Sequence, residues 1–153
     1  MKPGVEILFP AHVEVDEFNT LLDAMEQAEA PIPAAKVFHR TLRSDDKERV
    51  SLNHCLCAAA RSEGSLVGCA RVVTDHAYIY YILDVMVHPD RQREGLGAEM
   101  LKRMVAYADQ KGFIKLLLTA IPGSEPFYER MGFRPSASTL MTMRGEDRQG
   151  IEA

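Results

Sequence analysis

The first half of the chain carries apolar residues at the spacing of an amphipathic helix. Four of them recur three and four positions apart, namely Phe18, Leu21, Leu22 and Met25. This spacing puts all four on one face, so we predict a helix from about Asp16 to Ala28. Prolines interrupt the pattern directly afterwards, and a weaker helical segment continues through Arg43.

Five shorter apolar runs, bounded by turn residues, predict strands. These runs are Val5–Phe9, Cys55–Arg61, Leu66–Thr74, Tyr78–Val87 and Ile114–Thr119. The Ser-Glu-Gly-Ser sequence at 62–65 joins the second run to the third, which predicts an antiparallel hairpin. A further helix is expected from about Leu96 to Lys111. This order of elements predicts an α/β fold, with a central mixed sheet flanked by helices.

One strand-to-helix junction, from Asp84 to Ala98, is suited to hold an anion. Amide groups at a helix start have no partner within the helix, and the helix dipole adds partial positive charge there. Gly95 and Gly97 allow the backbone to approach a ligand closely. Arg91 and Arg93 would add formal charge at the rim. The expected ligand is a phosphate or a pyrophosphate.

Two common phosphate-binding motifs do not fit this junction. A dinucleotide fingerprint needs a third small residue three positions after Gly97, and Met100 stands there. A P-loop needs Gly-Lys-Ser or Gly-Lys-Thr, and the chain has neither triplet. An unrelated phosphate-binding α/β domain is one alternative.

A second segment follows at residues 124–133, with the sequence Ser-Glu-Pro-Phe-Tyr-Glu-Arg-Met-Gly-Phe. Ser124 is expected as the N-cap of a short helix, Pro126 in its first turn, and Gly132 as the residue that ends it. The helix would carry an aromatic pair at Phe127 and Tyr128.

The two segments together resemble the GNAT superfamily of acyl-CoA-dependent N-acetyltransferases. Residues 92–97, Gln-Arg-Glu-Gly-Leu-Gly, resemble its pyrophosphate loop, and residues 127–133 resemble its closing F-Y-E-x-x-G-F signature. One departure is Ile121, which stands where many members carry Asn. The resemblance covers Tyr78 to Phe133. It implies a GNAT-like fold with the pyrophosphate loop at a strand-to-helix turn.

The resemblance also implies a reaction. An acetyl group would pass from acetyl-CoA to a primary amine of a small molecule, by direct attack in a ternary complex. The pantetheine arm would lie along the strand before the loop, and the loop amides would hold the pyrophosphate. The expected acetyl-CoA contacts are Val85, Met86, Val87, Gln92, Arg93, Glu94, Gly95, Leu96, Gly97, Ala98, Ser124 and Phe127.

Two residues are the candidates for proton transfer. Tyr128 is the expected general acid, because a phenol is protonated at neutral pH and can protonate the departing thiolate. Its alternative role is to pack the short helix against the sheet. Asp84 is the expected general base, since it is the only ionisable group, apart from tyrosines, in its strand. Its alternative is a carboxylate hydrogen-bonded to the backbone at a β-bulge.

The acceptor site is expected around the connection from Ala28 to Arg43. Acidic residues nearby, Glu26, Glu29, Asp45 and Asp46, could attract a cationic amine. Tyr78, Tyr80 and Tyr81 could form the floor of a pocket. A peptide or protein amine is the alternative acceptor, and a non-catalytic acyl-CoA sensor or regulatory module is the alternative function.

Composition is consistent with a single enzyme domain. The 153 residues are 46% hydrophobic and 26% charged, which predicts one domain at 1–143 with a polar tail at 144–153. The net charge of −4 argues against nucleic acid and anionic membranes as partners. We expect a cytoplasmic protein and a homodimer. Cys55, Cys57 and Cys69 are interpreted as reduced, buried thiols, with no metal site.

Overall fold

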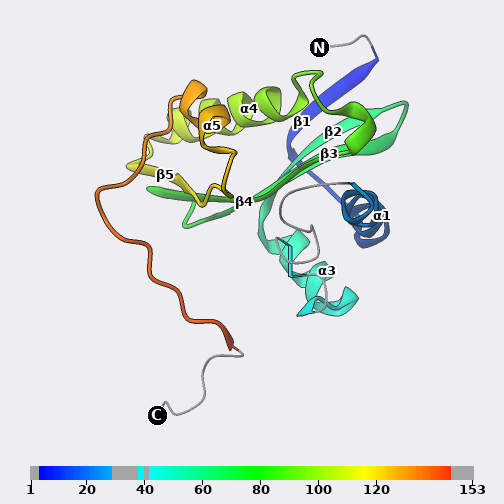
Figure 1. Ribbon diagram of the computed structural model, residues 1–153, viewed down its shortest axis with the longest axis horizontal. Helices are drawn as coiled ribbons and strands as arrows, with labels where there is room; N and C mark the ends of the chain where they lie inside the picture. Colours follow the sequence, from blue (N-terminus) through cyan, green and yellow to red (C-terminus); the bar gives the residue numbers. More distant parts are fainter. Residues whose placement is uncertain (1–3, 29–37, 40–41, 146–153) are drawn as a thin grey trace.

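A mixed five-stranded sheet forms the centre of the computed structural model, which describes residues 4–28, 38–39 and 42–145 (Figure 1). The strands lie in chain order, β1-β2-β3-β4-β5. The first four pair antiparallel and β5 joins β4 in parallel. Their bounds are β1 Val5–Ala11, β2 Leu56–Ser62, β3 Ser65–Thr74, β4 Ile79–Val87 and β5 Lys115–Leu118.

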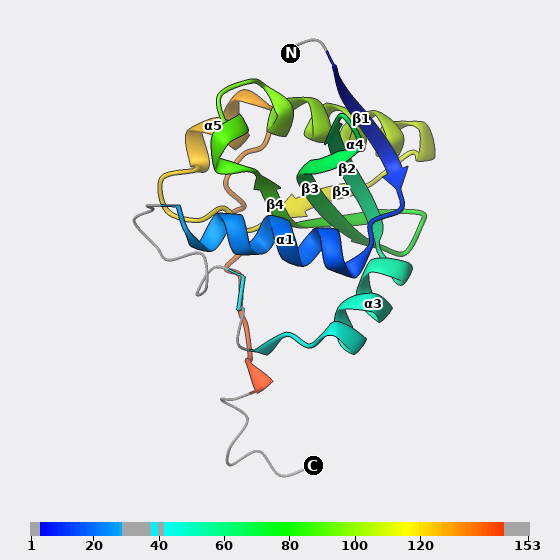
Figure 2. The same cartoon turned by 90° about the vertical axis from the view of Figure 1, so that its right-hand side faces the viewer.

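Helices cover both faces of this sheet, as the fold prediction required (Figure 2). On one face lie α1, Val15–Glu26, and α3, Asp45–His54. On the other face lie α4, Leu96–Lys111, and the short α5, Glu125–Arg130. Two apolar cores result, one between the sheet and α4 and one between the sheet and α1. Because both faces of β3 are covered over most of its length, its residues 66–72 are all buried.

The helix that leads away from the anion-binding junction begins and ends as predicted. α4 runs from Leu96 to Lys111, with Gly95 as its N-cap and Gly112 as its C-cap. Both glycines have positive φ, at 84° and 69°, which a residue with a side chain rarely adopts. The apolar face of α4 buries Leu96, Met100, Leu101, Met104 and Ala108.

The expected β2–β3 hairpin is present. Its turn residues Glu63 and Gly64 have φ of 51° and 82°, the conformation of a type I′ turn. In contrast, α3 was not predicted, because its apolar face holds only Leu52. The other buried residue of α3 is Glu48. The weaker helical segment expected through Arg43 lies mostly outside the described residues.

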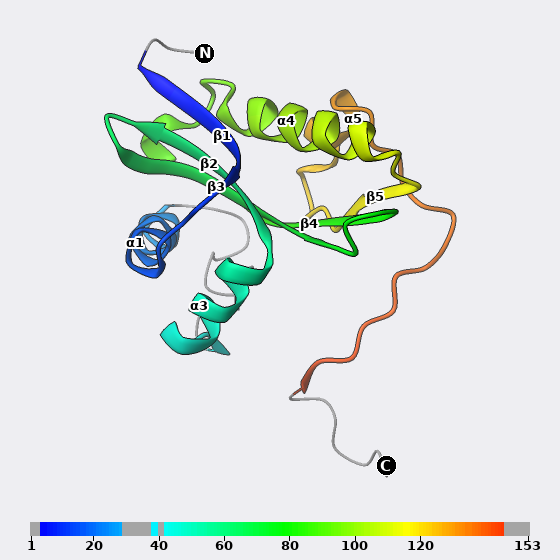
Figure 3. The ribbon, with the colours of Figure 1, turned by 180° about the vertical axis from the view of Figure 1, so that it is seen from behind.

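Beyond α5 the chain leaves the body of the molecule as an extended segment (Figure 3). Every residue from 134 to 145 is exposed. None of the described helices is long and apolar enough to cross a membrane.

Candidate active site

The strands β4 and β5 pair over only half of the length of β4. Ile79 to Ile82 pair with Lys115 to Leu118 in parallel register. Within the described residues, no strand joins β4 beyond Ile82 on that side. The backbone of residues 83–87 therefore has an open edge, where an extended ligand can form hydrogen bonds of the kind that a neighbouring strand would form.

A β-bulge at Asp84 lies at the start of this open edge. Cys69 pairs with Met86 and Arg71 pairs with Leu83, so two residues of β4 face the single residue Ala70 of β3. The φ of Asp84 is 53°, in the left-handed region. The bulge lets the Asp84 side chain point toward α3, while Val85 and Val87 pack on the α4 side.

The loop between β4 and α4 is held by its own side chains. Gln92 Nε2 donates to the Val87 carbonyl over 3.1 Å, which fixes the loop to the end of the strand. Arg91 forms an ion pair with Glu94, with 2.8 Å between Nε and Oε2. Arg93 is exposed and has positive φ, 66°. The positive charge that the sequence suggested for Arg91 is therefore partly neutralised, and Arg93 is the better placed cation of the two.

The first turn of α4 presents backbone amides at the end of this loop. The first hydrogen bond within the helix is donated by Glu99 N–H to Gly95 O, over 3.0 Å. The N–H groups of Leu96, Gly97 and Ala98 precede it and have no acceptor inside the helix. They are the unpaired amides that the sequence predicted at this junction. The Leu96 side chain points into the core, so only its backbone is available to a ligand.

Gly97 lies where α4, α5 and the end of β4 come together. A Cβ on Gly97 would lie 3.4 Å from Cζ of Phe127 and 3.8 Å from Cγ2 of Val87. A single methyl group would thus make ordinary contacts, but a larger side chain would fill the space between Phe127 and Val87.

The short helix α5 places Tyr128 beside the point where β4 and β5 part. The Tyr128 ring packs edge-on against Phe127 and Phe133, with ring centroids 5.1 and 6.1 Å apart. Burial raises the pKa of the Tyr128 phenol. The hydroxyl forms no hydrogen bond with the described residues, so its proton is available to a ligand.

Tyr128 also lines a groove of about 610 Å³ along β5. Its other walls are the Tyr81 side chain, β5 itself, the acidic residues Glu125 and Glu129, and the start of the extended segment. The Tyr81 hydroxyl lies 2.9 Å from Thr119 Oγ1. The groove therefore offers a phenol that is free to donate, and two carboxylates that can attract a cation.

Asp84 belongs to a buried network of four charged side chains. Its carboxylate accepts hydrogen bonds from Arg71 and, over 3.0 Å, from Arg43. Both arginines also donate to Glu48, over 2.8 Å from Arg71 and 2.9 Å from Arg43. Only 3% of the Arg71 side chain and 11% of the Asp84 side chain are exposed. Two positive and two negative groups thus compensate one another in the interior.

This network joins the connection between α1 and α3 to β4. Arg43 Nε donates to the Phe38 carbonyl over 2.6 Å, while a second nitrogen of the same side chain binds Asp84. Arg71 stacks on the Phe18 ring at 5.0 Å and donates to Ser51 over 2.8 Å. Burial disfavours the charge on Arg71, but Asp84 and Glu48 raise its pKa above the ordinary value.

Several predicted roles change once the side chains are placed. Ser124 is at the N-cap of α5 but makes no capping bond, because its hydroxyl donates to the Ile121 carbonyl over 2.7 Å. Tyr80 is 1% exposed in the α4 core, so it cannot form the floor of a pocket with Tyr81. Cys57 and Cys69 are buried as predicted, but Cys55 is only partly buried. Burial raises the pKa of the Cys57 thiol to about 11. Within the described ranges, no three His, Cys, Asp or Glu side chains are grouped to hold a metal.

The geometry fits an extended ligand that carries an anionic group at one end. The open edge of β4 can bind a chain of amides, and the amides at the start of α4 can bind a pyrophosphate. At the junction between them, Tyr128 is placed to donate a proton. These are the features that an acyl-CoA molecule requires, and they involve Val85, Met86, Val87 and the backbone of residues 93–98.

Comparison with known proteins supports this interpretation. The model of the acetyltransferase (GNAT) family matches residues 18–133. One relative, GCN5-related N-acetyltransferase 2 of Arabidopsis thaliana, is 34% identical over 83 residues, which are 54% of this chain and 32% of that protein. The uncharacterized N-acetyltransferase ycf52 of Pyropia yezoensis is 26% identical over 80% of this chain and 66% of its own length. The chain thus spans between a third and two thirds of these relatives.

Solved structures share the fold. A probable acetyltransferase from methicillin-resistant Staphylococcus aureus superimposes with a TM-score of 0.72 at 16% identity, covering 92% of this chain and 98% of that one. A putative acetyltransferase from Xanthomonas campestris gives a TM-score of 0.68 at 24% identity, covering 97% and 99%.

Proposed function

Because the chain belongs to the acetyltransferase (GNAT) family, we propose that it transfers the acetyl group of acetyl-CoA to a primary amine of a small molecule. The observation that carries this proposal is the open edge of β4, which runs into the unpaired amides of α4 with the Tyr128 phenol beside it. Backbone groups of Val85 to Val87 would hold the pantetheine arm. Those of residues 93–98 would hold the pyrophosphate, with Arg93 nearby.

We further propose that the amine attacks the thioester directly, in a ternary complex. An ammonium cannot attack, so the amine must first lose a proton, and the departing thiolate must gain one. Tyr128 supplies that proton in our proposal, since its raised pKa keeps the phenol protonated at neutral pH.

A general base must accept the proton that the amine loses. Asp84 stays the predicted general base, but its carboxylate already accepts hydrogen bonds from two guanidinium groups. Asp84 does lie at a β-bulge, as the alternative expected, but its carboxylate binds the side chains of Arg43 and Arg71 and not the backbone. This arrangement favours a structural role for Asp84, in which it holds the two arginines in place. A carboxylate in such ion pairs is less available to take a proton from an amine, directly or through water.

A small molecule is favoured as the acceptor by the size of the groove beside Tyr128. Its volume, about 610 Å³, is in the range of small-molecule sites. Glu125 and Glu129 on its wall would attract a cationic amine.

A panel of amines tests the proposed function. The chain is mixed with acetyl-CoA and, separately, with aliphatic diamines, aromatic amines, amino sugars and peptides that have a free N-terminus or lysine. Release of free thiol is followed, and acetylated products are identified by mass spectrometry. We expect turnover with at least one small amine. Turnover on peptides alone would show that the acceptor is a peptide or protein amine and not a small molecule. Tight acetyl-CoA binding without any turnover would support the non-catalytic module.

A further inference from the structure

One histidine near the bulge of β4, His39, has a ring that is not engaged by the rest of the described structure. The chain has five histidines. His12, His54 and His88 each use a ring nitrogen in a hydrogen bond with a neighbouring group. His76 lies in the turn between β3 and β4, at the opposite end of β4 from the bulge. The His39 side chain is exposed and makes no hydrogen bond or ion pair with the described residues.

The backbone on both sides of His39 is held in place. Phe38 is 6% exposed and belongs to the core under α1. Its carbonyl accepts the hydrogen bond from Arg43 Nε, and Arg43 also binds Asp84 at the bulge. The His39 carbonyl accepts a hydrogen bond from Leu42 N–H over 3.0 Å. His39 itself has a φ of 52°, in the left-handed region, and such strained residues are concentrated at active sites.

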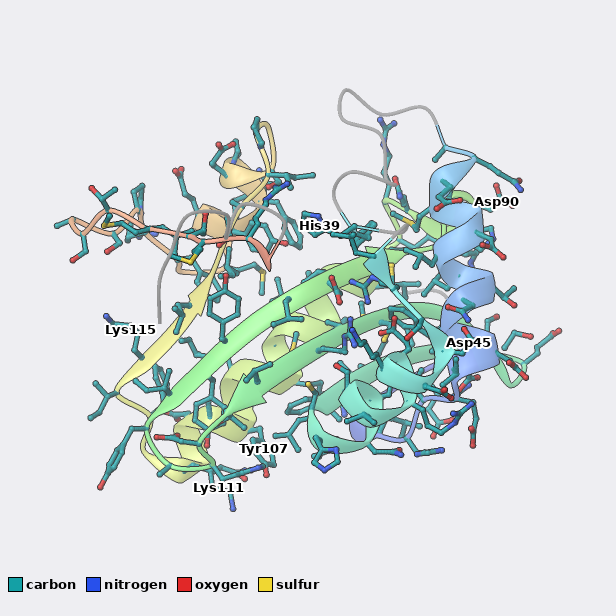
Figure 4. The ribbon with its side chains drawn as sticks, turned by 90° about the horizontal axis from the view of Figure 1, so that it is seen from below. His39, Asp45, Asp90, Tyr107, Lys111 and Lys115 are labelled. Atoms are coloured by element: carbon teal, nitrogen blue, oxygen red, sulfur yellow. The ribbon has the colours of Figure 1, made fainter. Side chains whose placement is uncertain are left out.

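His39 lies on the same face of the sheet as the Tyr81 wall of the groove. Arg71 donates to Ser51 of α3, so its side chain is on the face that carries α1 and α3. Val73 follows two residues later and pairs with Tyr81, so Tyr81 points to this face as well. Figure 4 shows His39 over β4 on this face, with α1 to one side of it and α5 to the other.

Tyr128 approaches the point where β4 and β5 part from the other face, because it packs against the core under α4. In a direct attack, the amine that enters and the thiolate that leaves are different substituents of one tetrahedral carbon. The base that serves the amine and the acid that serves the thiolate therefore have to come from different sides. His39 on the α1 face and Tyr128 on the α4 face meet this requirement.

We propose that His39 is the general base of the reaction, an inference that rests on the proposed function. The imidazole accepts a proton from the ammonium group, since a histidine can take up and release a proton near neutral pH. The amine nitrogen then bonds to the carbonyl carbon, the carbon–sulfur bond breaks, and the thiolate takes the proton of Tyr128. The new amide loses its second proton to water, and exchange with water restores His39 and Tyr128. Asp84 keeps its structural role, because through Arg43 it holds the backbone next to His39.

The His39→Asn variant tests the chemical role with an amine identified in the panel. Asparagine adopts positive φ readily but cannot act as a base. We expect kcat to fall about 100-fold or more at saturating acetyl-CoA. Acetyl-CoA affinity and melting temperature should match those of the parent, since the lost ring is exposed and makes no hydrogen bond with the described residues. His76→Asn is the matched control, because His76 is also exposed and has a φ of 64°. Its turnover should stay within a few-fold of the parent.

Labelling with bromoacetyl-CoA tests the position of His39 without any amine. This reagent carries a carbon–bromine bond where acetyl-CoA has its methyl group. An imidazole within reach attacks that carbon, so that a nitrogen–carbon bond forms, bromide leaves and the ring proton passes to water. Mass spectrometry of the digested protein should find the label on His39 and not on His76, and excess CoA should prevent it.

The two experiments separate this inference from the proposed function. A parent protein that acetylates none of the amines would contradict the proposed function, while labelling of His39 would still place its ring at the acyl group. An unlabelled His39 would overturn the inference, as would a His39→Asn variant that is as active as His76→Asn.

Discussion

The Tyr128→Phe variant should lose about 100-fold or more in kcat, the low end of what general acid catalysis contributes. The substitution keeps the ring, and with it the contacts to Phe127 and Phe133. It removes only the hydroxyl group, which forms no hydrogen bond with the described residues. Acetyl-CoA affinity and melting temperature should therefore match those of the parent, and the loss should appear in kcat measured at saturating acetyl-CoA.

Tyr81→Phe is the matched control for this variant. It removes a hydroxyl from the same groove, but one that is 2.9 Å from Thr119 Oγ1. Its turnover should lie within a few-fold of the parent. If Tyr128→Phe behaves in the same way as Tyr81→Phe, then Tyr128 packs α5 against the sheet and gives no proton.

The Asp84→Asn variant should be strongly destabilised. The change preserves shape but leaves Arg43 and Arg71 with Glu48 as the one buried counter-charge among the described residues. Breaking a buried ion pair from one side costs about 3 kcal/mol or more. For a domain of this size that corresponds to a fall in melting temperature of roughly 6–12 °C. Scanning calorimetry of the purified variant measures it.

Asp46→Asn serves as the control for this second prediction. Asp46 pairs with Arg49 at the surface, where both side chains are largely exposed, so no change in melting temperature is expected. If Asp84→Asn is not destabilised, the result would favour Asp84 as the general base. In that case Asp84→Asn would melt at the temperature of the parent, while kcat would fall and the pH–rate profile would lose its acidic limb.

The sequence predicted the parts of the fold that depend on local patterns. The helix expected from about Leu96 to Lys111 agrees with α4 at both ends. The loop and the α5 segment were found in the same way, because glycines, a proline and an aromatic pair mark them. These features are short and contiguous, and so they can be read from one chain.

The buried ion-pair network could not be predicted in this way. Asp84 lies 13 residues from Arg71 and 41 from Arg43, and such distant pairs leave no periodic pattern. One signal was present, since Arg71 is the single charged residue in the apolar run Leu66–Thr74. A charge buried in a central strand needs a partner, which would have pointed to Asp84 or Glu48. The helix α3 was missed for a related reason. It is held to the sheet by the ion pair between Glu48 and Arg71, and not by an apolar face.

Titration of acetyl-CoA into the parent protein and the Gly97→Val variant tests the central claim most directly. The valine side chain would occupy the space between Phe127 and Val87 and crowd the amides at the start of α4. The control is Gly145→Val, where a Cβ would meet no atom within 4 Å. By calorimetry, we expect the parent and the control to bind equally, and Gly97→Val to bind about tenfold more weakly or worse, a loss of at least ~1.4 kcal/mol. If folded Gly97→Val binds acetyl-CoA with the affinity of the parent, the strand–loop–helix junction is not the acyl-CoA site.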